Sequence, residues 1–332
     1  MASPVSAVSA VSAASAVSAA AYIGVDVAKA EVVIAHQGHL TTVANRQRDL
    51  RRWLRALPPG CALAVEATST YHQLLADLAH AGGHAVYVLN PKQLKHYRSA
   101  TRGRAKTDTC DALLLARYLE REQRHLHPYV PLEPATQRLC MLLRRRASVV
   151  KATTLLKLSL HAQASQLGLA GPVQTVLAAH QQLVAAMDQQ IAALLSQPCH
   201  QASASRLQSI VGIGPLSAAA LLVALQRGEF TTPEALVAFI GLDPVPQESG
   251  QSCGRRRLSK QGDSETRRLL YNAAMSASLT KLWRPLYERY LQRGLSRIQT
   301  LCILARKLVR LAWSLHKHQT TFCPERFAKA LT

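Results

Sequence analysis

The first third of the chain alternates short apolar runs with amphipathic segments. In residues 45–57 and 70–81 the apolar positions recur at helical spacing, and the runs between them are short and apolar. The predicted order is two strands within residues 21–38 with a turn near Ala28–Ala30, a strand at 40–44, a helix at 45–57, a strand at 61–68, a helix at 70–81 and a strand at 84–90. Strands that alternate with helices predict an α/β domain with a largely parallel core sheet.

Beyond Pro134 the pattern changes to long helical segments. Residues 135–168 and 173–197 are predicted to form two long helices, interrupted at Gly171-Pro172. In the second helix, apolar residues recur every three or four positions from Val176 to Leu194. This spacing indicates a helical hairpin or coiled-coil arm that contacts another subunit, and a plain helical core explains it equally well.

A further helical region begins near residue 205. Gly212 and Gly214 lie in a short turn between two helical stretches, as in a helix-hairpin-helix, where glycines let backbone N–H groups approach a phosphate. A simple turn between two helices is an equal alternative. Residues 244–264 are rich in Pro, Gly, Ser and basic residues and are predicted to form a loop, followed by helices over residues 265–318.

These patterns divide the chain into four parts. They are a leader at residues 1–20, an α/β domain at 21–130, a helical arm at 131–199, and a mainly helical C-terminal domain at 200–332 that contains the helix-hairpin-helix-like segment. The leader repeats Val-Ser-Ala without a basic start, and its serines would interrupt the apolar core of a secretion signal. We therefore expect it to be disordered or an alternative start, with no role in export.

The charge of the chain predicts a polyanionic partner. The sequence has 40 Lys and Arg against 19 Asp and Glu, a net charge of +21. The basic residues are spread over several segments, which favours nucleic acid over a membrane surface. Because aromatic residues make up only 5%, contacts with the phosphate backbone should dominate over base stacking. Candidate backbone contacts on the arm are Arg144, Arg145 and Arg146, which are otherwise a solvated helix face.

The cysteines and the hydropathy indicate the cellular compartment of the chain. Seven cysteines are scattered along the sequence without any CxxC pair, which argues for a reducing compartment without disulfides or structural zinc. No run of eighteen apolar residues is present, so no membrane span is expected. We therefore expect a cytoplasmic protein.

Four acidic residues stand out in this basic chain. Asp26 ends the first predicted strand, Glu66 ends a second core strand, and Asp108 and Asp111 open a predicted helix with Thr107 as its N-cap. Each acid alone can be a turn, a cap or a solvated edge, and a pair in a first helical turn also complements the helix dipole. A carboxylate after the buried run before Glu66 is costly unless it binds something. Together the four suit two divalent cations at a phosphodiester, as in an RNase H-like nuclease fold.

The segments around these acids resemble a known family. Asp26 in YIGVDVAK, Glu66 in VEATSTYH, LNP at 89–91 and KTDTCDA at 106–112 together resemble the DEDD transposases of insertion sequences. Members of that family have a RuvC-like N-terminal domain, and Piv-type DNA invertases are their relatives. Further along, IVGIGPLSAAALL, AFIGLDPVPQESG and LSKQGDSETRRLLYNAA look like the family's second domain. The resemblance covers roughly residues 21–315 and rests on the order of the pieces.

The resemblance implies a recombinase that moves its own element through a circular intermediate. In the family a serine of the second domain attacks DNA, and Ser249 in QESG matches it, with Ser252 and Ser259 as neighbouring alternatives. A covalent phosphoserine conserves bond energy for rejoining without ATP. The implied ligands of two Mg²⁺ ions are Asp26, Glu66, Asp108 and Asp111. The expected DNA contacts of the serine loop are Arg255, Arg256, Arg257 and Lys260.

The resemblance also implies partners beyond the donor and target DNA. A structured RNA transcribed from the element pairs with both DNAs, so that bases read sequence while the protein reads backbone shape and charge. Family members act as dimers and tetramers in which the carboxylates of one subunit meet the serine of another. The helical arm at residues 135–197 is the candidate for that assembly.

Three alternatives remain open on the sequence alone. An invertase of the same architecture would need no RNA, and a metal-dependent junction nuclease would use water in place of Ser249. A non-catalytic nucleic-acid binder would show steep salt dependence without any cutting. The sequence also departs from the family at Asp243, where Thr is common, and this extra acid is either a turn residue or a further metal contact.

Overall fold

The computed structural model describes residues 21–67, 70–100, 108–160, 163–245, 248–249, 252–253 and 257–331. The described residues up to Pro131 form one compact unit and those from Leu132 onward form another. The leader at residues 1–20 and the N-cap predicted at Thr107 lie outside the described residues. The separation of the second unit into an arm and a C-terminal domain stays a prediction.

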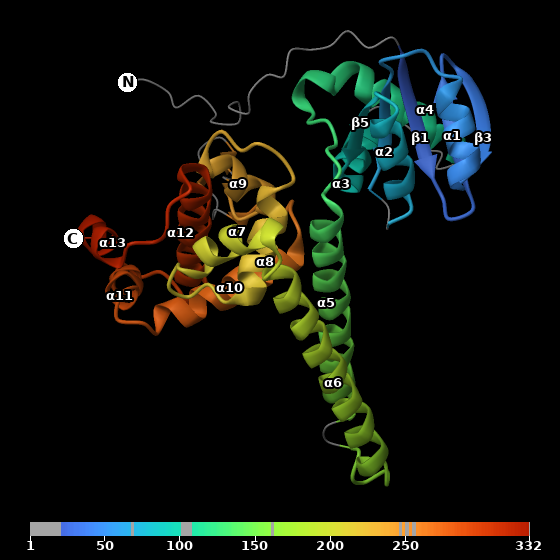
Figure 1. Ribbon diagram of the computed structural model, residues 1–332. Coiled ribbons are helices and arrows are strands. Elements are labelled where there is room, and N and C mark those ends of the chain that lie inside the picture. The colour runs from blue at the N-terminus through green and yellow to red at the C-terminus, as the bar shows by residue number, and fades with distance from the viewer. Residues whose placement is uncertain are drawn as a thin grey trace. The chain divides into compact units, whose positions relative to one another are not determined.

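The first unit is an α/β domain (Figure 1). Its elements are β1 (Tyr22–Val27), β2 (Glu31–His36), β3 (His39–Ala44), α1 (Gln47–Arg55), β4 (Ala62–Glu66), α2 (His72–Ala81), β5 (Ala85–Leu89), α3 (Pro91–Ala100), α4 (Asp108–Glu122) and a 3₁₀ turn at Gln123–His125. Every strand and helix predicted between residues 21 and 90 is confirmed, with ends that differ by a few residues. Helix α3 was not predicted.

The sheet has the order β3-β2-β1-β4-β5. Strands β1, β4 and β5 run parallel, whereas β2 pairs antiparallel with both β1 and β3. The expectation of a largely parallel sheet was therefore wrong, since two of the four pairings are antiparallel. The physical reason is the short connections at residues 28–30 and 37–38, because a parallel pairing needs a long crossover and a tight turn permits only a hairpin.

Alternate residues of the strands feed two separate cores. Ile23, Val25 and Val65 point to one face, where they pack with Leu50 and Leu54 of α1 and with apolar residues of α2. The residues of opposite parity point to the other face, which α3 and α4 cover. That second core consists of Ala62, Ala64, Tyr87, Leu89, Leu94, Leu115 and Leu119. Each face of the sheet is thus covered by helices, as an α/β domain requires.

The second unit is almost entirely helical. Its elements are α5 (Pro134–Leu160), α6 (Ala170–Leu195), α7 (Pro198–Gln208), α8 (Pro215–Leu225), α9 (Pro233–Ile240), the two-residue strands β6 (Pro244–Val245), β7 (Glu248–Ser249), β8 (Ser252–Cys253) and β9 (Arg257–Leu258), α10 (Ser264–Ser278), α11 (Arg284–Gln292), α12 (Arg297–His318) and α13 (Pro324–Leu331). Helix α8 is the centre of its core, because every residue from Ser217 to Leu225 is buried. The segment predicted as a plain loop contains the four short strands.

Helices α5 and α6 form the predicted hairpin. Their junction differs from the prediction: α5 ends at Leu160, and Gly171-Pro172 lies inside the first turn of α6. Proline is tolerated there because the first N–H groups of a helix have no partner within the helix. The two helices are joined by an ion pair between Arg146 and Asp188 and by Thr153, whose hydroxyl lies 2.9 Å from Nδ1 of His180.

Candidate active site

The carboxylates of the first unit are placed by the parallel pairing of β1 with β4. The register aligns Gly24 with Ala64 and Val25 with Val65, so Asp26 and Glu66 follow next at the carboxyl ends of neighbouring strands. Successive side chains of a strand alternate between faces, so Asp26 shares its face with Gly24, and Glu66 shares its face with Ala64. Both acids therefore lie on the face that α4 covers, and both are partly buried.

Helix α4 crosses that face in close contact with β1. A Cβ atom at Gly24 would lie 1.9 Å from the carbonyl oxygen of Ala112, so only glycine permits this approach. At the start of β1, the hydroxyl of Tyr22 donates to the side chain of Gln123, just past the helix, at 3.0 Å. The helix therefore runs antiparallel to β1, and its N-terminus points to the strand ends that carry Asp26 and Glu66.

This direction brings Asp111 to the same edge of the sheet. Asp111 is 8% exposed, and its Oδ1 accepts a hydrogen bond of 2.5 Å from Nη2 of Arg98 on α3. Asp108 begins α4, one turn closer to the helix end, and its side chain lies outside the described residues. Of the four predicted carboxylates, Asp26, Glu66 and Asp111 thus come to one edge from three different elements, with the start of α4 beside them.

The donor set fits a divalent cation by its chemistry. Carboxylates at the ends of adjacent strands offer the hard oxygen ligands that Mg²⁺ prefers. Among the described side chains, no three His, Cys, Asp or Glu residues lie close enough together to hold a metal ion. The side chain of Asp108, the fourth predicted ligand, lies outside the described ones. The metal-ligand roles of the four acids therefore remain predictions.

Arg98 is a residue of this edge that the sequence analysis missed. It lies on α3, which follows β5 directly and begins at Pro91. In the sequence Arg98 is one of several basic residues ahead of Asp108, and nothing in its spacing distinguishes it from its neighbours. Only the packing of α3 beside α4 reveals that its guanidinium meets a buried acid.

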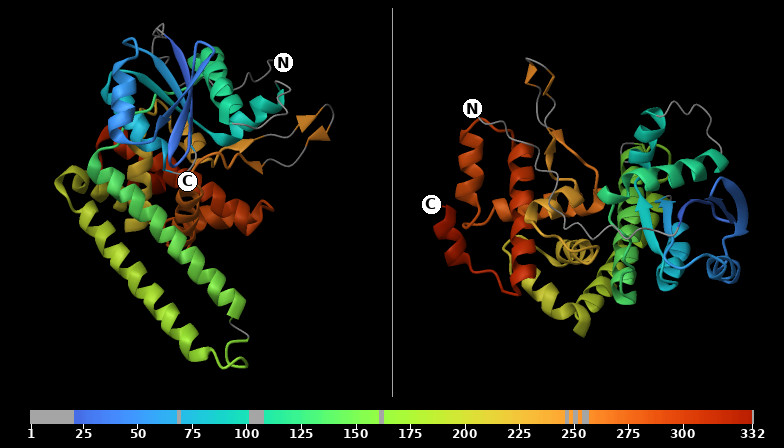
Figure 2. Two further views of the ribbon diagram at one scale, coloured as in Figure 1. Left: turned by 90° about the vertical axis from the view of Figure 1, so that its right-hand side faces the viewer. Right: turned by 90° about the horizontal axis from the view of Figure 1, so that it is seen from above.

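Ser249 belongs to the second unit and lies on one of two short β-ladders. Strand β7 pairs with β8, with Ser249 opposite Ser252, and β6 pairs with β9. In Figure 2 the β-ladders extend away from the helices of their own unit. At their base, the hydroxyl of Ser259 donates to the carboxylate of Asp243, and the Ser259 N–H donates to the Asp243 carbonyl oxygen at 3.0 Å. Asp243 thus closes the base of this segment, as a turn residue does.

Basic residues gather near the same base. Lys260 follows β9 and is exposed, and helix α12 carries Arg306, Lys307 and Arg310, of which Arg306 interacts electrostatically with Asp243. Burial lowers the pKa of Arg306 and of Lys307, and the positive charge of Arg310 lowers both pKa values further. The carboxylates of Asp243 and Glu234 act in the opposite direction on the pKa of Arg306, and Glu234 also pairs with Arg310 at 3.2 Å, so these cations are partly balanced within the protein.

The other predicted nucleic-acid contacts occupy different surroundings. Arg144 and Arg145 are exposed on α5, whereas Arg146 is committed to its ion pair with Asp188. Arg257 is exposed on β9, and Arg255 and Arg256 lie outside the described residues. Gly212 and Gly214 lie between α7 and α8, which pack together as both a helix-hairpin-helix and a simple turn between helices would require. None of the helices among the described residues is both long and apolar enough to cross a lipid bilayer.

Comparison with known proteins covers most of the chain. A family model described as a transposase, of the DEDD type named after IS110, matches residues 23–168. A second model, described as transposase IS116/IS110/IS902 family, matches residues 204–290. The first model spans nearly all of the first unit and the start of the second, and the second model lies within the second unit.

Curated relatives agree with these matches over nearly full length. A pilin gene-inverting protein of Moraxella bovis is 28% identical, with 91% of this chain and 97% of the relative covered. A probable family 20 transposase of Pseudomonas aeruginosa is 27% identical over 91% of this chain and 98% of its own length. A transposase of the insertion sequence element IS1328 from Yersinia enterocolitica is 25% identical over 90% and 98%. The chain belongs to the IS110-type transposase family of insertion sequences, whose members cut and rejoin DNA.

Proposed function

We propose that the chain is a site-specific recombinase that moves an insertion sequence by cutting and rejoining DNA through a covalent phosphoserine at Ser249. The observation that carries the proposal is the meeting of Asp26, Glu66 and the N-terminal turn of α4 at one edge of the sheet. Carboxylates gathered in a chain of net charge +21 repel the DNA that the rest of the surface attracts, so they are best explained by the reaction itself.

In this proposal Asp26, Glu66, Asp108 and Asp111 hold divalent cations, which we take to be two Mg²⁺ ions. When bound, such ions stabilise the charge on the attacking and leaving oxygens of a phosphodiester. The protein's own contribution is to fix the acids on rigid elements, two on strands and two on the first turn of a helix. Arg98 holds the side chain of Asp111 in place.

Ser249 is the nucleophile of the proposed reaction. Its Oγ forms a bond to the scissile phosphorus while the bond from phosphorus to a deoxyribose oxygen breaks, and that oxygen leaves as a hydroxyl after taking a proton. A serine hydroxyl is a weak nucleophile at neutral pH and needs a base or a cation to activate it. The reverse attack by a deoxyribose hydroxyl on the phosphoserine rejoins the DNA, with the number of phosphoester bonds unchanged at each step.

A composite site shared between subunits explains how the two units cooperate. The distal part of the α5–α6 hairpin exposes large apolar side chains, among them Leu155 at 59% and Leu158 at 77%. Exposed leucines at helical spacing are typical of a coiled-coil contact between chains. We propose that the hairpin joins subunits into a dimer or tetramer, in which Ser249 of one subunit meets the carboxylates of another.

Guidance by a structured RNA of the element is the further part of the proposal. The high positive charge and the scarcity of aromatic residues support a protein that contacts backbones and leaves base recognition to pairing. The second candidate is a DNA invertase without an RNA, which the 28% identity to the pilin gene-inverting protein favours. The two are distinguished by whether cutting of the element end requires RNA transcribed from the flanking DNA.

The test is a denaturing gel of full-length protein incubated with Mg²⁺, element-end DNA and the flanking transcript. Wild type is compared with Ser249→Ala, Asp108→Asn and the matched control Ser252→Ala, which removes the hydroxyl opposite Ser249. We expect a protein–DNA adduct in wild type and Ser252→Ala that is lost in the other two. If the DNA is cleaved without an adduct, and cleavage persists in Ser249→Ala, the protein is a nuclease that uses water and the proposed recombinase chemistry is wrong.

A further inference from the structure

Helix α1 carries a dense row of arginines on the side of the sheet away from the carboxylates. Its apolar residues Leu50 and Leu54 are buried in the core on the Ile23 and Val25 face. Asp26 faces the opposite side, which α4 covers. A ligand on the outer surface of α1 is therefore separated from the catalytic carboxylates by the thickness of the sheet.

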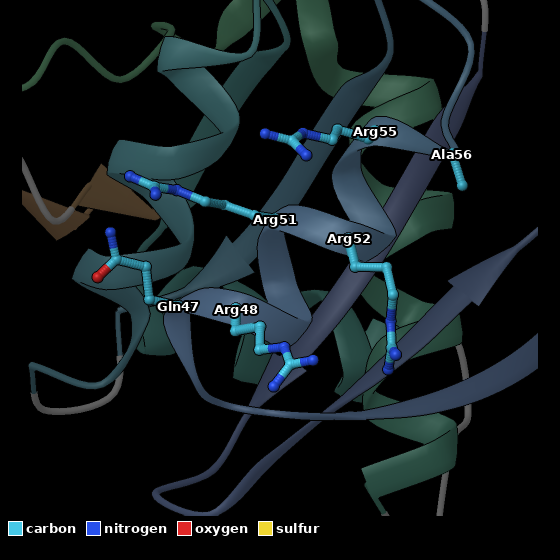
Figure 3. Close-up of a pocket in the computed structure, with 6 residues that line it drawn as sticks. All are labelled: Gln47, Arg48, Arg51, Arg52, Arg55 and Ala56. Atoms are coloured by element: carbon cyan, nitrogen blue, oxygen red, sulfur yellow. The ribbon is translucent and has the colours of Figure 1, made fainter.

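An open, shallow space over the outer surface of α1 is lined by Gln47, Arg48, Arg51, Arg52, Arg55 and Ala56. Figure 3 shows the side chains of Arg51 and Arg55 extending to one side of the helix, and those of Arg48 and Arg52 to the other. All four arginines are exposed. We call these four residues the α1 arginine surface.

The stability of the helix explains only part of this surface. Arg48 lies in the first turn, where the positive end of the helix dipole disfavours a cation. Arg48 and Arg52 are four residues apart, as are Arg51 and Arg55, and like charges at this spacing destabilise a helix. Asp49 lies in the first turn and pairs with Arg52 at 3.3 Å, an exposed contact of little energetic value. Arg52 and Arg55 lie in the last turn, where a cation complements the helix dipole, so helix stability accounts for these two. It does not account for Arg48 and Arg51, which are better explained by a ligand.

We propose that the α1 arginine surface binds the phosphodiester backbone of a nucleic-acid segment other than the one at the catalytic carboxylates. Guanidinium groups bind phosphate through two parallel hydrogen bonds, which a row of lysines would not provide. From Arg48 to Arg55 the helix rises about 10 Å, which spans roughly three phosphates of one strand. The surface goes beyond the proposed recombination chemistry, since it binds without cutting.

The test is equilibrium binding by full-length protein in a chelating buffer, where no strand is cut. The probes are a DNA duplex, a DNA single strand and an RNA hairpin of equal length, each measured by fluorescence anisotropy at about 50 and 200 mM salt. The variant is R48Q/R51Q/R55Q. On a duplex each lost phosphate contact should reduce the salt-induced weakening about 3.5-fold, so the triple variant should reduce it roughly 40-fold on that probe, and somewhat less on a single strand.

Two matched variants separate a binding surface from general charge and from folding. R117Q/R121Q/R124Q removes the same number of positive charges from exposed positions of the first unit, in a segment that also carries Glu120 and Glu122. R48K/R51K/R55K keeps the charge of α1 and should keep the salt dependence of wild type.

The outcomes decide the inference and name the ligand. If the α1 variant loses salt dependence only with the DNA duplex, only with the single strand or only with the RNA hairpin, the proposal is supported and that probe identifies the partner. The proposal is overturned if the α1 variant matches the R117Q/R121Q/R124Q control on all three probes. Because binding is measured without metal, a wild type that never forms the Ser249 adduct would refute the proposed reaction and leave this result untouched.

Discussion

Arg98 and Asp111 join α3 to α4 through a contact of 2.5 Å between Nη2 and Oδ1. The side chain of Asp111 is 10% exposed and that of Arg98 is 24% exposed. A carboxylate in such surroundings is costly without a cation nearby, and Arg98 provides one. If Asp111 also binds a divalent cation, the arginine and the metal ion neutralise the same charge.

Arg98→Ala should destabilise the first unit by about 2–3 kcal/mol, because it leaves Asp111 buried without its partner. The measurement is thermal unfolding in a chelating buffer, with Arg284→Ala as the control. Arg284 pairs with Glu288 at 2.8 Å, but both side chains are at least half exposed, so its loss should cost no more than about 1 kcal/mol.

Adding Mg²⁺ to the same samples tests the metal site. If Asp111 is a ligand, Mg²⁺ should raise the unfolding temperature of Arg98→Ala more than that of wild type, since the ion replaces the missing charge and binds only the folded state. An equal rise in both proteins would argue against Asp111 as a ligand, whatever its effect on stability.

Gly24→Ala should cost roughly 3 kcal/mol or more, and it should act through the position of α4. The new methyl group would lie 1.9 Å from a backbone carbonyl oxygen and 2.4 Å from the N atom of Ala116, neither of which can move without the helix. Gly228→Ala is the control, because nothing lies within 4 Å of its Cβ position. A Gly24→Ala protein with wild-type stability would contradict the close packing of α4 on β1.

The sequence predicts the first unit well because turns and periodicity are local. Each predicted strand between residues 21 and 90 has its apolar run and its bounding turn, and the structure keeps all of them. Strand direction is predicted less well, because the alternation of strands with helices favours a parallel sheet, whereas the antiparallel pairing of β2 with both of its neighbours follows from two short connections. Helix α3 has a single buried residue, Leu94, so it offers almost no apolar face to detect.

The candidate site divides in the same way. The positions of Asp26 and Glu66 at strand ends follow from the sequence, since each acid terminates an apolar run. The role of Gly24 does not, because a glycine inside a strand has no distinguishing pattern until α4 is packed on it. The pairing of Arg98 depends on two features, the packing of α3 beside α4 and the burial of Asp111. No spacing along the chain indicates either of them.

Gly212 and Gly214 were predicted alike, and the structure distinguishes them. Gly212 has φ +103°, and a Cβ there would lie 2.6 Å from that of Ala277, whereas nothing lies within 4 Å of a Cβ at Gly214. Gly212→Ala should therefore cost roughly 2–4 kcal/mol, and Gly214→Ala about 0.5 kcal/mol.

Binding separates the two roles further. Gly214 is the N-cap residue of α8, so a methyl group there should weaken DNA binding roughly two- to tenfold, the value of one hydrogen bond, if a phosphate approaches the helix N-terminus. On this pair of variants, chemical denaturation measures the stability and fluorescence anisotropy measures the affinity for DNA. Unchanged DNA binding by a stable Gly214→Ala protein would leave this turn with a packing role alone.

His316 should make the second unit sensitive to acid. Burial lowers the pKa of His316, and the positive charge of Arg206 lowers it further, relative to the ordinary value of 6.5. The unfolded chain then binds more protons than the folded one between the two pKa values, so stability falls as the pH drops below about 6.5 and stops falling below the pKa of the folded state.

Denaturant unfolding at pH 7.5 and at lower pH measures this loss, and His316→Gln should reduce it because the group that titrates is gone. The control is His318→Gln, an exposed residue of the same helix, which should keep the acid sensitivity of wild type. Arg206→Gln should reduce the loss only partly, because it removes the positive charge near His316 while burial, the larger cause of the lowered pKa, remains. Equal acid sensitivity in wild type and His316→Gln would assign the loss to another group.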